Sequence, residues 1–279
     1  MGDGARLVLG EKICVFTKTL KRYYSNRHKN YATQVARKQK ERAVAEARIF
    51  YIADVFCPWC FAFAPIMERL ANQFPEFPVK VIGGNLISRP LTLAEDVKMS
   101  PGLTDFWREV EQVSGRSLAG AIEAAETGRH ITLFSPGTDE ILVALKSFAP
   151  GHELRQLIEL ETMFYGQGKN LFSEESLGEI AGRWGISLEK FERALDQPAA
   201  LEATERNLEQ AAQLMGEIGS YPSVLLVRDG KVDAVTRGYV RYETVLSRFE
   251  SAMADLKLTN EAELYCSARN ACSLRGRRT

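Results

Sequence analysis

Two cysteines separated by two residues, Cys57 and Cys60, stand out in the sequence FYIADVFCPWCFAFAPIMERL over 50–70. Two kinds of site use this spacing: a redox-active dithiol and one half of a zinc site. The pair comes directly after an apolar run and directly before a helical pattern. These flanking elements decide which of the two chemistries is favoured.

The residues around the pair predict a strand, a junction and a helix. Residues 48–55 (RIFYIADV) are β-branched and aromatic, as in a buried strand, and 58–74 repeat apolar residues at spacings of three and four. Pro58 suits the first turn of this helix, where a missing N–H costs nothing. Cys57 therefore falls at the helix N-terminus, where unpaired N–H groups and the helix dipole favour a thiolate.

A thiolate in this position predicts redox chemistry with a different role for each sulfur. Cys57 would be the exposed nucleophile that forms a mixed disulfide, and Cys60, one turn inside the helix, would resolve it. Pro58 stiffens the turn between them, and Trp59 adds a bulky apolar face. Asp54 could tune the thiolate or accept a proton, although an Asp before a helix more often caps it or ends a strand.

The competing zinc site lacks a complete ligand set at suitable spacing. A structural zinc ion usually takes four ligands, often as pairs with two to four residues between them. Five residues separate Cys266 from Cys272, and His28, His130 and His152 are isolated. We therefore expect no metal, and the redox dithiol is favoured.

A second motif lies in GEIGSYPSVLLVRDG over 216–230. Pro222 stands directly before a predicted strand, 223–228, where a cis Tyr221–Pro222 bond would be a specific feature. If this loop faces the cysteines, the Tyr221 backbone can pair with an extended peptide while Pro222 shields the sulfurs. Alone, the proline is typical of an ordinary loop-to-strand junction, but together the two motifs favour the functional interpretation.

The remaining pattern predicts one α/β domain, 48–257, that carries a large all-helical insertion. Residues 48–90 and 219–257 supply its strands, and 91–218 contain almost no strand signal. The insertion is predicted to hold helices at 102–113, 117–127, 136–148, 152–165, 174–184, 188–196 and 199–218. The domain is predicted to begin with a βαβ unit whose second strand is 79–82, and to end with a β-hairpin followed by a helix at 241–257. Together these two units predict an α/β sandwich.

The two ends of the chain differ from this centre. From Lys18 to Arg48 there are ten Lys or Arg residues against two Glu, so 1–47 is expected to be a basic, solvated extension, partly helical or disordered. Residues 258–279 are expected to form a flexible tail.

Composition and charge argue against several classes of protein. The 36 basic and 36 acidic residues balance, which gives no argument for nucleic-acid or membrane partners. The N-terminus lacks the apolar core of a signal peptide, and no apolar run is long enough to span a bilayer. Five cysteines are an odd count, unlike a secreted disulfide scaffold. We therefore expect a cytoplasmic protein.

The strand–CPWC–helix of 50–70, the helical block and YPSVLLVRDG together resemble the DsbA-like branch of the thioredoxin superfamily. Within this branch, the sequence is similar to disulfide oxidoreductases and isomerases that lack a signal peptide, including the FrnE-like proteins. In those proteins a Gly-Gly also follows the second strand. The resemblance implies an α/β thioredoxin-like fold, with Cys57 as nucleophile, Cys60 as resolving cysteine and Tyr221–Pro222 as the cis-proline loop. Pro-Trp replaces the Pro-His of the periplasmic oxidant, so the redox potential stays open.

The resemblance also implies partners. The substrates would be thiols and disulfides of proteins or peptides, with no organic cofactor, and glutathione or a thioredoxin-type reductant would exchange electrons with the site. FrnE-like proteins can carry another cysteine pair near the C-terminus, so Cys266 and Cys272 are a candidate accessory redox pair. The simpler interpretation is two unpaired thiols in a flexible tail.

Two other functions stay open beside a protein-disulfide oxidoreductase or isomerase. Kappa-class glutathione transferases and hydroxychromene-carboxylate isomerases resemble this architecture, but they generally have Ser at the position of Cys57 and lack the second cysteine. Alternatively, a non-catalytic module would bind zinc through Cys57, Cys60, Cys266 and Cys272.

Overall fold

The computed structural model describes residues 47–254, except 217–218 and 229. These residues belong to one compact unit, Ala47–Thr279. The predicted basic extension, apart from Ala47, and the predicted tail with Cys266 and Cys272 lie outside the described residues.

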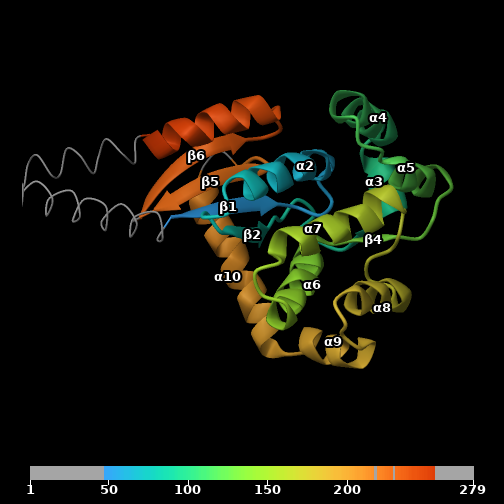
Figure 1. Ribbon diagram of the computed structural model, residues 1–279. Coiled ribbons are helices and arrows are strands. Elements are labelled where there is room, and N and C mark those ends of the chain that lie inside the picture. Colours follow the sequence, from blue (N-terminus) through green and yellow to red (C-terminus); the bar gives the residue numbers. More distant parts are fainter. Residues whose placement is uncertain (1–46, 217–218, 229, 255–279) are drawn as a thin grey trace, which may run out of the picture. The chain divides into compact units, whose positions relative to one another are not determined.

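The described residues form a four-stranded sheet in the order β2-β1-β5-β6 (Figure 1). Its strands are β1 (Arg48–Ala53), β2 (Val79–Gly83), β5 (Ser223–Arg228) and β6 (Lys231–Arg237). Strand β1 runs parallel to β2 and antiparallel to β5, and β6 returns antiparallel to β5. The two parts of the chain that were predicted to supply strands therefore meet along the β1–β5 pair.

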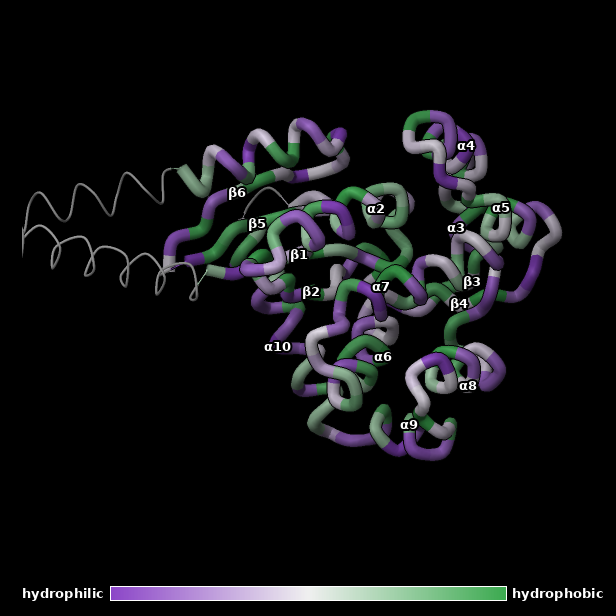
Figure 2. Tube along the Cα trace, viewed as in Figure 1, coloured by the Kyte–Doolittle hydropathy of each residue, from purple (hydrophilic) through white to green (hydrophobic). Residues whose placement is uncertain are grey.

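Helices cover both faces of this sheet. Helix α2 (Pro58–Gln73) and a helical segment at 242–254 lie on one face, and α10 (Pro198–Met215) lies on the other (Figure 1). Phe50 and Ile52 of β1 pack with Ala211 and Met215 of α10 in one core cluster. Because β1 is buried on both faces, its sequence is almost continuously apolar (Figure 2).

The insertion is helical, with additions that the sequence did not indicate. It contains α3 (Leu93–Met99), α4 (Leu103–Ser114), α5 (Ala119–Glu126), α6 (Ser135–Phe148), α7 (Glu153–Glu161), α8 (Glu174–Arg183) and α9 (Leu188–Leu195). Two strands of two residues each, β3 (Leu91–Thr92) and β4 (Thr132–Leu133), pair with each other. The helix predicted at 152–165 ends instead in a π-helical turn, η1 (Thr162–Gly166).

The helix α3 was missed although its N-terminus carries a recognisable signal. The Thr92 hydroxyl accepts from the Glu95 N–H, and the Glu95 carboxylate accepts from the Thr92 N–H, which makes a complete capping box. The two-residue strands are too short to show any periodicity. None of the described helices has the combination of length and hydrophobicity that crossing a membrane requires.

Candidate active site

The cysteine pair occupies the first turn of α2. Cys57 is the N-cap residue, with extended backbone, and the Cys60 N–H donates to the Cys57 carbonyl oxygen at 3.0 Å. Both thiols are free of disulfides. Cys57 keeps 6% of its surface exposed, whereas Cys60 is fully buried. Burial raises the pKa of the Cys60 thiol, and the neighbouring Cys57 and Glu161 raise it further.

The loop before β5 lies against the first of these sulfurs. The Tyr221–Pro222 bond is cis, and the Cys57 thiol donates to the Tyr221 carbonyl oxygen at 3.9 Å. The pairing of Ile52 with Ser223 at the end of the β1–β5 ladder brings the two loops together. The structure therefore joins the two sequence motifs at one end of the sheet.

Gly84 allows close packing beside this loop. A Cβ atom at Gly84 would lie 2.8 Å from the Asp54 Cβ and 2.9 Å from the Tyr221 Cε1. Real Cβ atoms are essentially never this close to other heavy atoms, so any larger residue would displace Asp54 or Tyr221. Gly84, the residue directly after β2, therefore has a steric role at the site.

Asp54 ties the active-site turn to the segment after β2. Its buried carboxylate accepts from the Phe56 N–H at 2.9 Å and from the Leu86 N–H at 2.8 Å. Burial raises the pKa of Asp54, and these hydrogen bonds oppose the rise. Asp54 does not cap α2, because Cys57 holds the N-cap position.

Two aromatic side chains from distant parts of the chain lie beside Trp59. Its ring centroid lies 5.1 Å from that of Tyr239, which follows β6, and 6.2 Å from that of Phe106 on α4. Phe106 is 38% exposed, which is high for a phenylalanine. Trp59 therefore belongs to an apolar surface beside the cysteines, which we call the Trp59 surface (Trp59, Phe106 and Tyr239).

The helical insertion also contacts the cysteine turn, through residues that sequence reasoning missed. The Tyr165 hydroxyl donates to the Phe56 carbonyl oxygen at 2.5 Å, and the Tyr165 ring stacks on Phe61. Phe61 also contacts Arg116, whose guanidinium carbon lies 3.6 Å from the ring centroid. No motif or spacing marks Arg116 or Tyr165 in the sequence, because only the packing of the insertion brings them to the site.

The described part of the chain holds no group of three or more His, Cys, Asp or Glu side chains placed to bind a metal ion. Two of the four ligands proposed for a zinc module, Cys266 and Cys272, lie outside the described residues.

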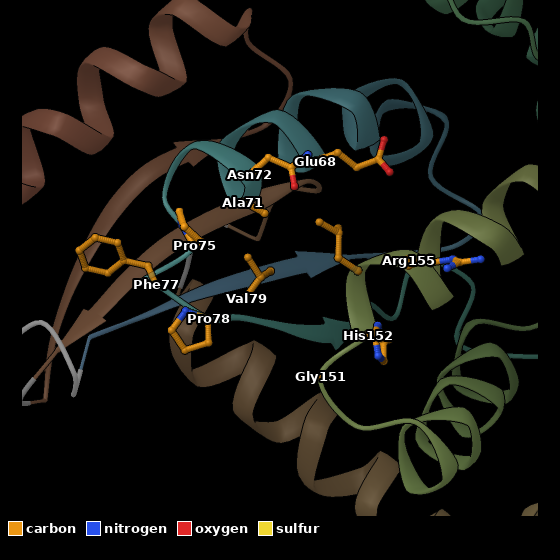
Figure 3. Close-up of a pocket in the computed structure, with 11 residues that line it drawn as sticks. Glu68, Ala71, Asn72, Pro75, Phe77, Pro78, Val79, Gly151, His152 and Arg155 are labelled. Atoms are coloured by element: carbon orange, nitrogen blue, oxygen red, sulfur yellow. The ribbon is translucent and has the colours of Figure 1, made fainter. Parts of the chain in front are cut away.

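A separate pocket of about 290 Å³ lies near the C-terminal end of α2 (Figure 3). Pro75, Phe77 and Pro78 border it on one side, and His152 and Arg155 from the start of α7 border it on the other (Figure 3). No cysteine lines this pocket, so it is distinct from the dithiol.

Comparison with known proteins gives distant relatives. No protein-family model matches the sequence. The ClpXP adapter protein SpxH of Bacillus subtilis is 23% identical over 172 residues, which cover 60% of this chain and 54% of SpxH. SpxH of Bacillus licheniformis is 24% identical over 206 residues, covering 71% and 65%. The chain therefore spans about half to two thirds of the length of these relatives.

Solved structures match over most of their length. A Nitrosomonas europaea protein provisionally assigned as a disulfide isomerase gives a TM-score of 0.63 at 19% identity, covering 75% of this chain and 98% of that one. The cytosolic disulfide reductase DsbM of Pseudomonas aeruginosa, also solved with GSH, gives 0.56 at 18%, covering 77% and 99%. A 2-hydroxychromene-2-carboxylate isomerase gives 0.50 at 14%, covering 77% and 98%. At these identities the likeness shows the fold alone.

Proposed function

Because the chain has the DsbA-like thioredoxin fold with a helical insertion, we propose that it is a thiol–disulfide oxidoreductase that acts on proteins or peptides. One observation carries the proposal. Two reduced cysteines lie in the first turn of α2, and the more exposed one contacts the carbonyl group that precedes a cis-proline. A nucleophilic Cys57 sulfur would therefore lie beside backbone that an extended peptide can pair with.

The reaction needs only the two sulfurs and balances as two thiol–disulfide exchanges. The Cys57 thiolate attacks one sulfur of the substrate disulfide, and the other substrate sulfur leaves as a thiolate. The Cys60 thiolate then attacks the Cys57 sulfur, the bond to the substrate breaks, and a Cys57–Cys60 disulfide forms. The substrate gains the two electrons that the cysteine pair loses.

The burial of the two cysteines supports this order of events. Cys57 alone keeps exposed surface, so the substrate meets it first. Cys60 is fully buried, and burial raises its pKa, which favours a protonated thiol until the mixed disulfide has formed. A dithiol whose second member stays protonated does not compete with Cys57 for the substrate.

Substrate binding would use the surfaces next to the sulfur. The Tyr221 carbonyl faces Cys57 and can accept from the backbone of a bound peptide, and the Trp59 surface can contact apolar side chains on it. Glutathione or a thioredoxin-type reductant would return electrons to the oxidised pair. DsbM is a cytosolic reductase and was solved with GSH, which supports glutathione as a partner and a cytoplasmic location.

Two alternatives are weaker. The 2-hydroxychromene-2-carboxylate isomerase superposes less well than the two disulfide-exchange proteins, and a glutathione-activating site has no use for Cys60.

The sequence identity to SpxH favours an adapter function as the second candidate. An adapter needs no sulfur chemistry, so binding and delivery of a partner that survive in a Cys57→Ser/Cys60→Ser double variant would favour it.

A redox titration tests the proposal. The protein is equilibrated in buffers of reduced and oxidised glutathione, and the disulfide is quantified by alkylation and mass spectrometry. We expect a single two-electron transition between Cys57 and Cys60. A potential well below the cytosolic poise of about −220 to −320 mV indicates a reductase, and one well above it an oxidant or isomerase. A dithiol that stays unchanged across all buffers would contradict the proposal.

A further inference from the structure

Helix α2 contains a proline, Pro65, in its interior. In an α-helix the carbonyl group of one residue accepts from the N–H of the residue four positions later, so the partner of the Phe61 carbonyl would be the N–H of residue 65. Proline has no N–H, and its ring crowds the carbonyl group four residues earlier. Pro65 therefore leaves the carbonyl group of Phe61, the residue directly after Cys60, without its intrahelical donor.

A residue of the helical insertion supplies the missing donor. The Arg116 guanidinium donates through Nη1 to the Phe61 carbonyl oxygen, and its central carbon lies 3.6 Å from the centroid of the Phe61 ring. Phe61 is buried, with 3% of its surface exposed. A buried carbonyl group without a partner lowers the stability of a fold. The bond from Arg116 therefore compensates for the hydrogen bond that Pro65 removes.

The turn that carries Arg116 is held by hydrogen bonds of its own. Gly115 caps the C-terminus of α4 with a φ of 73°, and its N–H donates to the Glu111 carbonyl oxygen at 2.8 Å. The Arg116 N–H donates to the Ser114 hydroxyl at 3.2 Å. The Leu118 N–H donates to the Glu111 carboxylate at 2.6 Å, and Leu118 is fully buried. Arg116 therefore reaches α2 from a backbone whose position is fixed.

The carbonyl group that Arg116 binds belongs to the same turn as the two sulfurs. The Phe61 N–H donates to the Cys57 carbonyl oxygen at 3.2 Å. The Cys60 carbonyl oxygen accepts from the hydroxyl of Tyr51, on β1, at 3.4 Å. The backbone at Cys60 and Phe61 is thus fixed by one donor from the sheet and one from the insertion. Because resolution of a mixed disulfide is an intramolecular attack, its rate depends on how closely the attacking sulfur is held.

We propose that Arg116 is a positioning residue that holds Cys60 in place to resolve the mixed disulfide, by binding the carbonyl group that Pro65 leaves free. This inference rests on the proposed exchange function. In the resolution step the Cys60 thiol loses its proton to solvent, and the thiolate forms a bond to the Cys57 sulfur. The bond between Cys57 and the substrate breaks, and the substrate thiolate leaves with that electron pair and takes a proton from solvent. Arg116 acts on this step only through the backbone of α2.

Arg116→Met tests this role, because loading and resolution can be measured separately. A peptide with a pyridyl disulfide loads Cys57 and releases pyridinethione, and the later release of the peptide thiol reports resolution by Cys60. We expect resolution to slow by about tenfold and loading to change by less than about twofold, since only the intramolecular step depends on the position of Cys60. Arg116→Lys keeps a charged donor, so its resolution rate should lie between those of Arg116→Met and wild type.

Pro65→Ala gives a sharper test, because alanine returns an N–H to the Phe61 carbonyl group. Pro65 is exposed, so its truncation should leave the core unchanged. We expect the double variant Arg116→Met/Pro65→Ala to resolve at least about fivefold faster than Arg116→Met. Burial raises the pKa of Glu161 and the charge of Arg116 lowers it, and Pro65→Ala cannot replace that charge. A double variant as slow as Arg116→Met would therefore overturn the proposal.

Arg129→Met is the matched control. Arg129 also belongs to the insertion, and its Nη1 also donates to a backbone carbonyl oxygen, that of Gly168, at 3.1 Å. Neither Arg129 nor Gly168 lies in α2, so we expect wild-type loading and resolution from this variant. Circular dichroism confirms that each variant is folded, and Arg116→Lys, with and without Pro65→Ala, replaces Arg116→Met if the latter is unfolded.

The outcomes separate this role from the exchange function itself. Wild-type resolution in Arg116→Met, or equal slowing in Arg129→Met, would overturn the role of Arg116 while leaving the exchange function standing. A folded wild-type protein that never loads Cys57 would overturn both.

Discussion

The Cys57 thiol lies 3.9 Å from the Tyr221 carbonyl oxygen, although the two residues are 164 positions apart in the sequence. The antiparallel pairing of β1 with β5 creates this contact, because the loops at the ends of the two strands meet. The whole insertion, from β3 to α10, is accommodated between the two strands in the sequence. The proposed nucleophile and the proposed peptide-binding backbone are therefore positioned by the same strand pair.

Replacing Gly84 should disturb this arrangement. In Gly84→Ala the new Cβ atom would overlap Asp54 and the Tyr221 ring, so we expect about 1–3 kcal/mol loss in the free energy of unfolding. The rate of disulfide exchange should fall as well. Urea unfolding and a peptide-disulfide assay measure the two effects.

Gly182→Ala is the control for that substitution. Gly182 lies in α8 with nothing within 4 Å of a Cβ atom, so alanine should stabilise the helix by about 0.5–1 kcal/mol. Equal effects of the two substitutions would show that the close packing at Gly84 has no importance.

The Trp59 surface should contribute to peptide binding but not to sulfur chemistry. Removing a buried aromatic anchor commonly costs an interface more than 1 kcal/mol, so Trp59→Ala should raise the KM for an apolar peptide disulfide by about tenfold. The rate with a small disulfide such as hydroxyethyl disulfide should change by less than about twofold, because no apolar side chain is bound.

Phe106→Ala should also raise the KM for the apolar peptide disulfide, by less than Trp59→Ala does, and should leave the rate with the small disulfide nearly unchanged. Phe148→Ala provides the control, because Phe148 is similarly exposed, at 42%, but lies at the end of α6. An equal loss with both disulfides would argue that Trp59 supports the structure of the cysteine turn and does not bind substrate.

The raised pKa of Asp139 predicts that the stability of the folded protein depends on pH. Burial raises the pKa of Asp139 to about 6, against the opposing charge of Lys146, whereas an unfolded Asp titrates at about 3.9. Between these values the folded protein keeps a proton that the unfolded chain has lost. The free energy of unfolding therefore falls as pH rises through this window.

Asp139→Asn should remove that fall. The stability of the variant relative to wild type should increase by on the order of 2–3 kcal/mol between pH 4 and pH 7. Urea unfolding at the two pH values gives the comparison. A relative stability that does not change with pH would show that Asp139 titrates normally in the folded protein.

The fold could be predicted largely from local pattern. The apolar run of β1, the spacing of apolar residues in α2 and the Asp-Gly hairpin signal each act over a few residues, and the α/β fold with a helical insertion is confirmed. The elements that were missed, α3 and the strand pair β3–β4, are short. The helix predicted at 152–165 ends in a π-helical turn, for which the sequence has no simple signal.

Some residues of the candidate site could also be predicted from local sequence pattern, and others could not. The spacing of Cys57 and Cys60 and the proline before β5 are visible in the sequence, and their roles stay predictions. Glu161 is different: within the segment ELETMF an acidic residue is typical of an exposed helix face. Only the packing of the insertion against α2 buries it. Its burial depends on tertiary contacts that no local pattern records.

Trapping in the Cys60→Ser variant tests the central claim most directly. The purified variant is incubated with a disulfide-bonded peptide, and the adducts are located by mass spectrometry after digestion, with Cys57→Ser as the control. The account predicts one stable mixed disulfide on Cys57 and none in the control. Absence of an adduct on Cys57, with the protein folded, would contradict it.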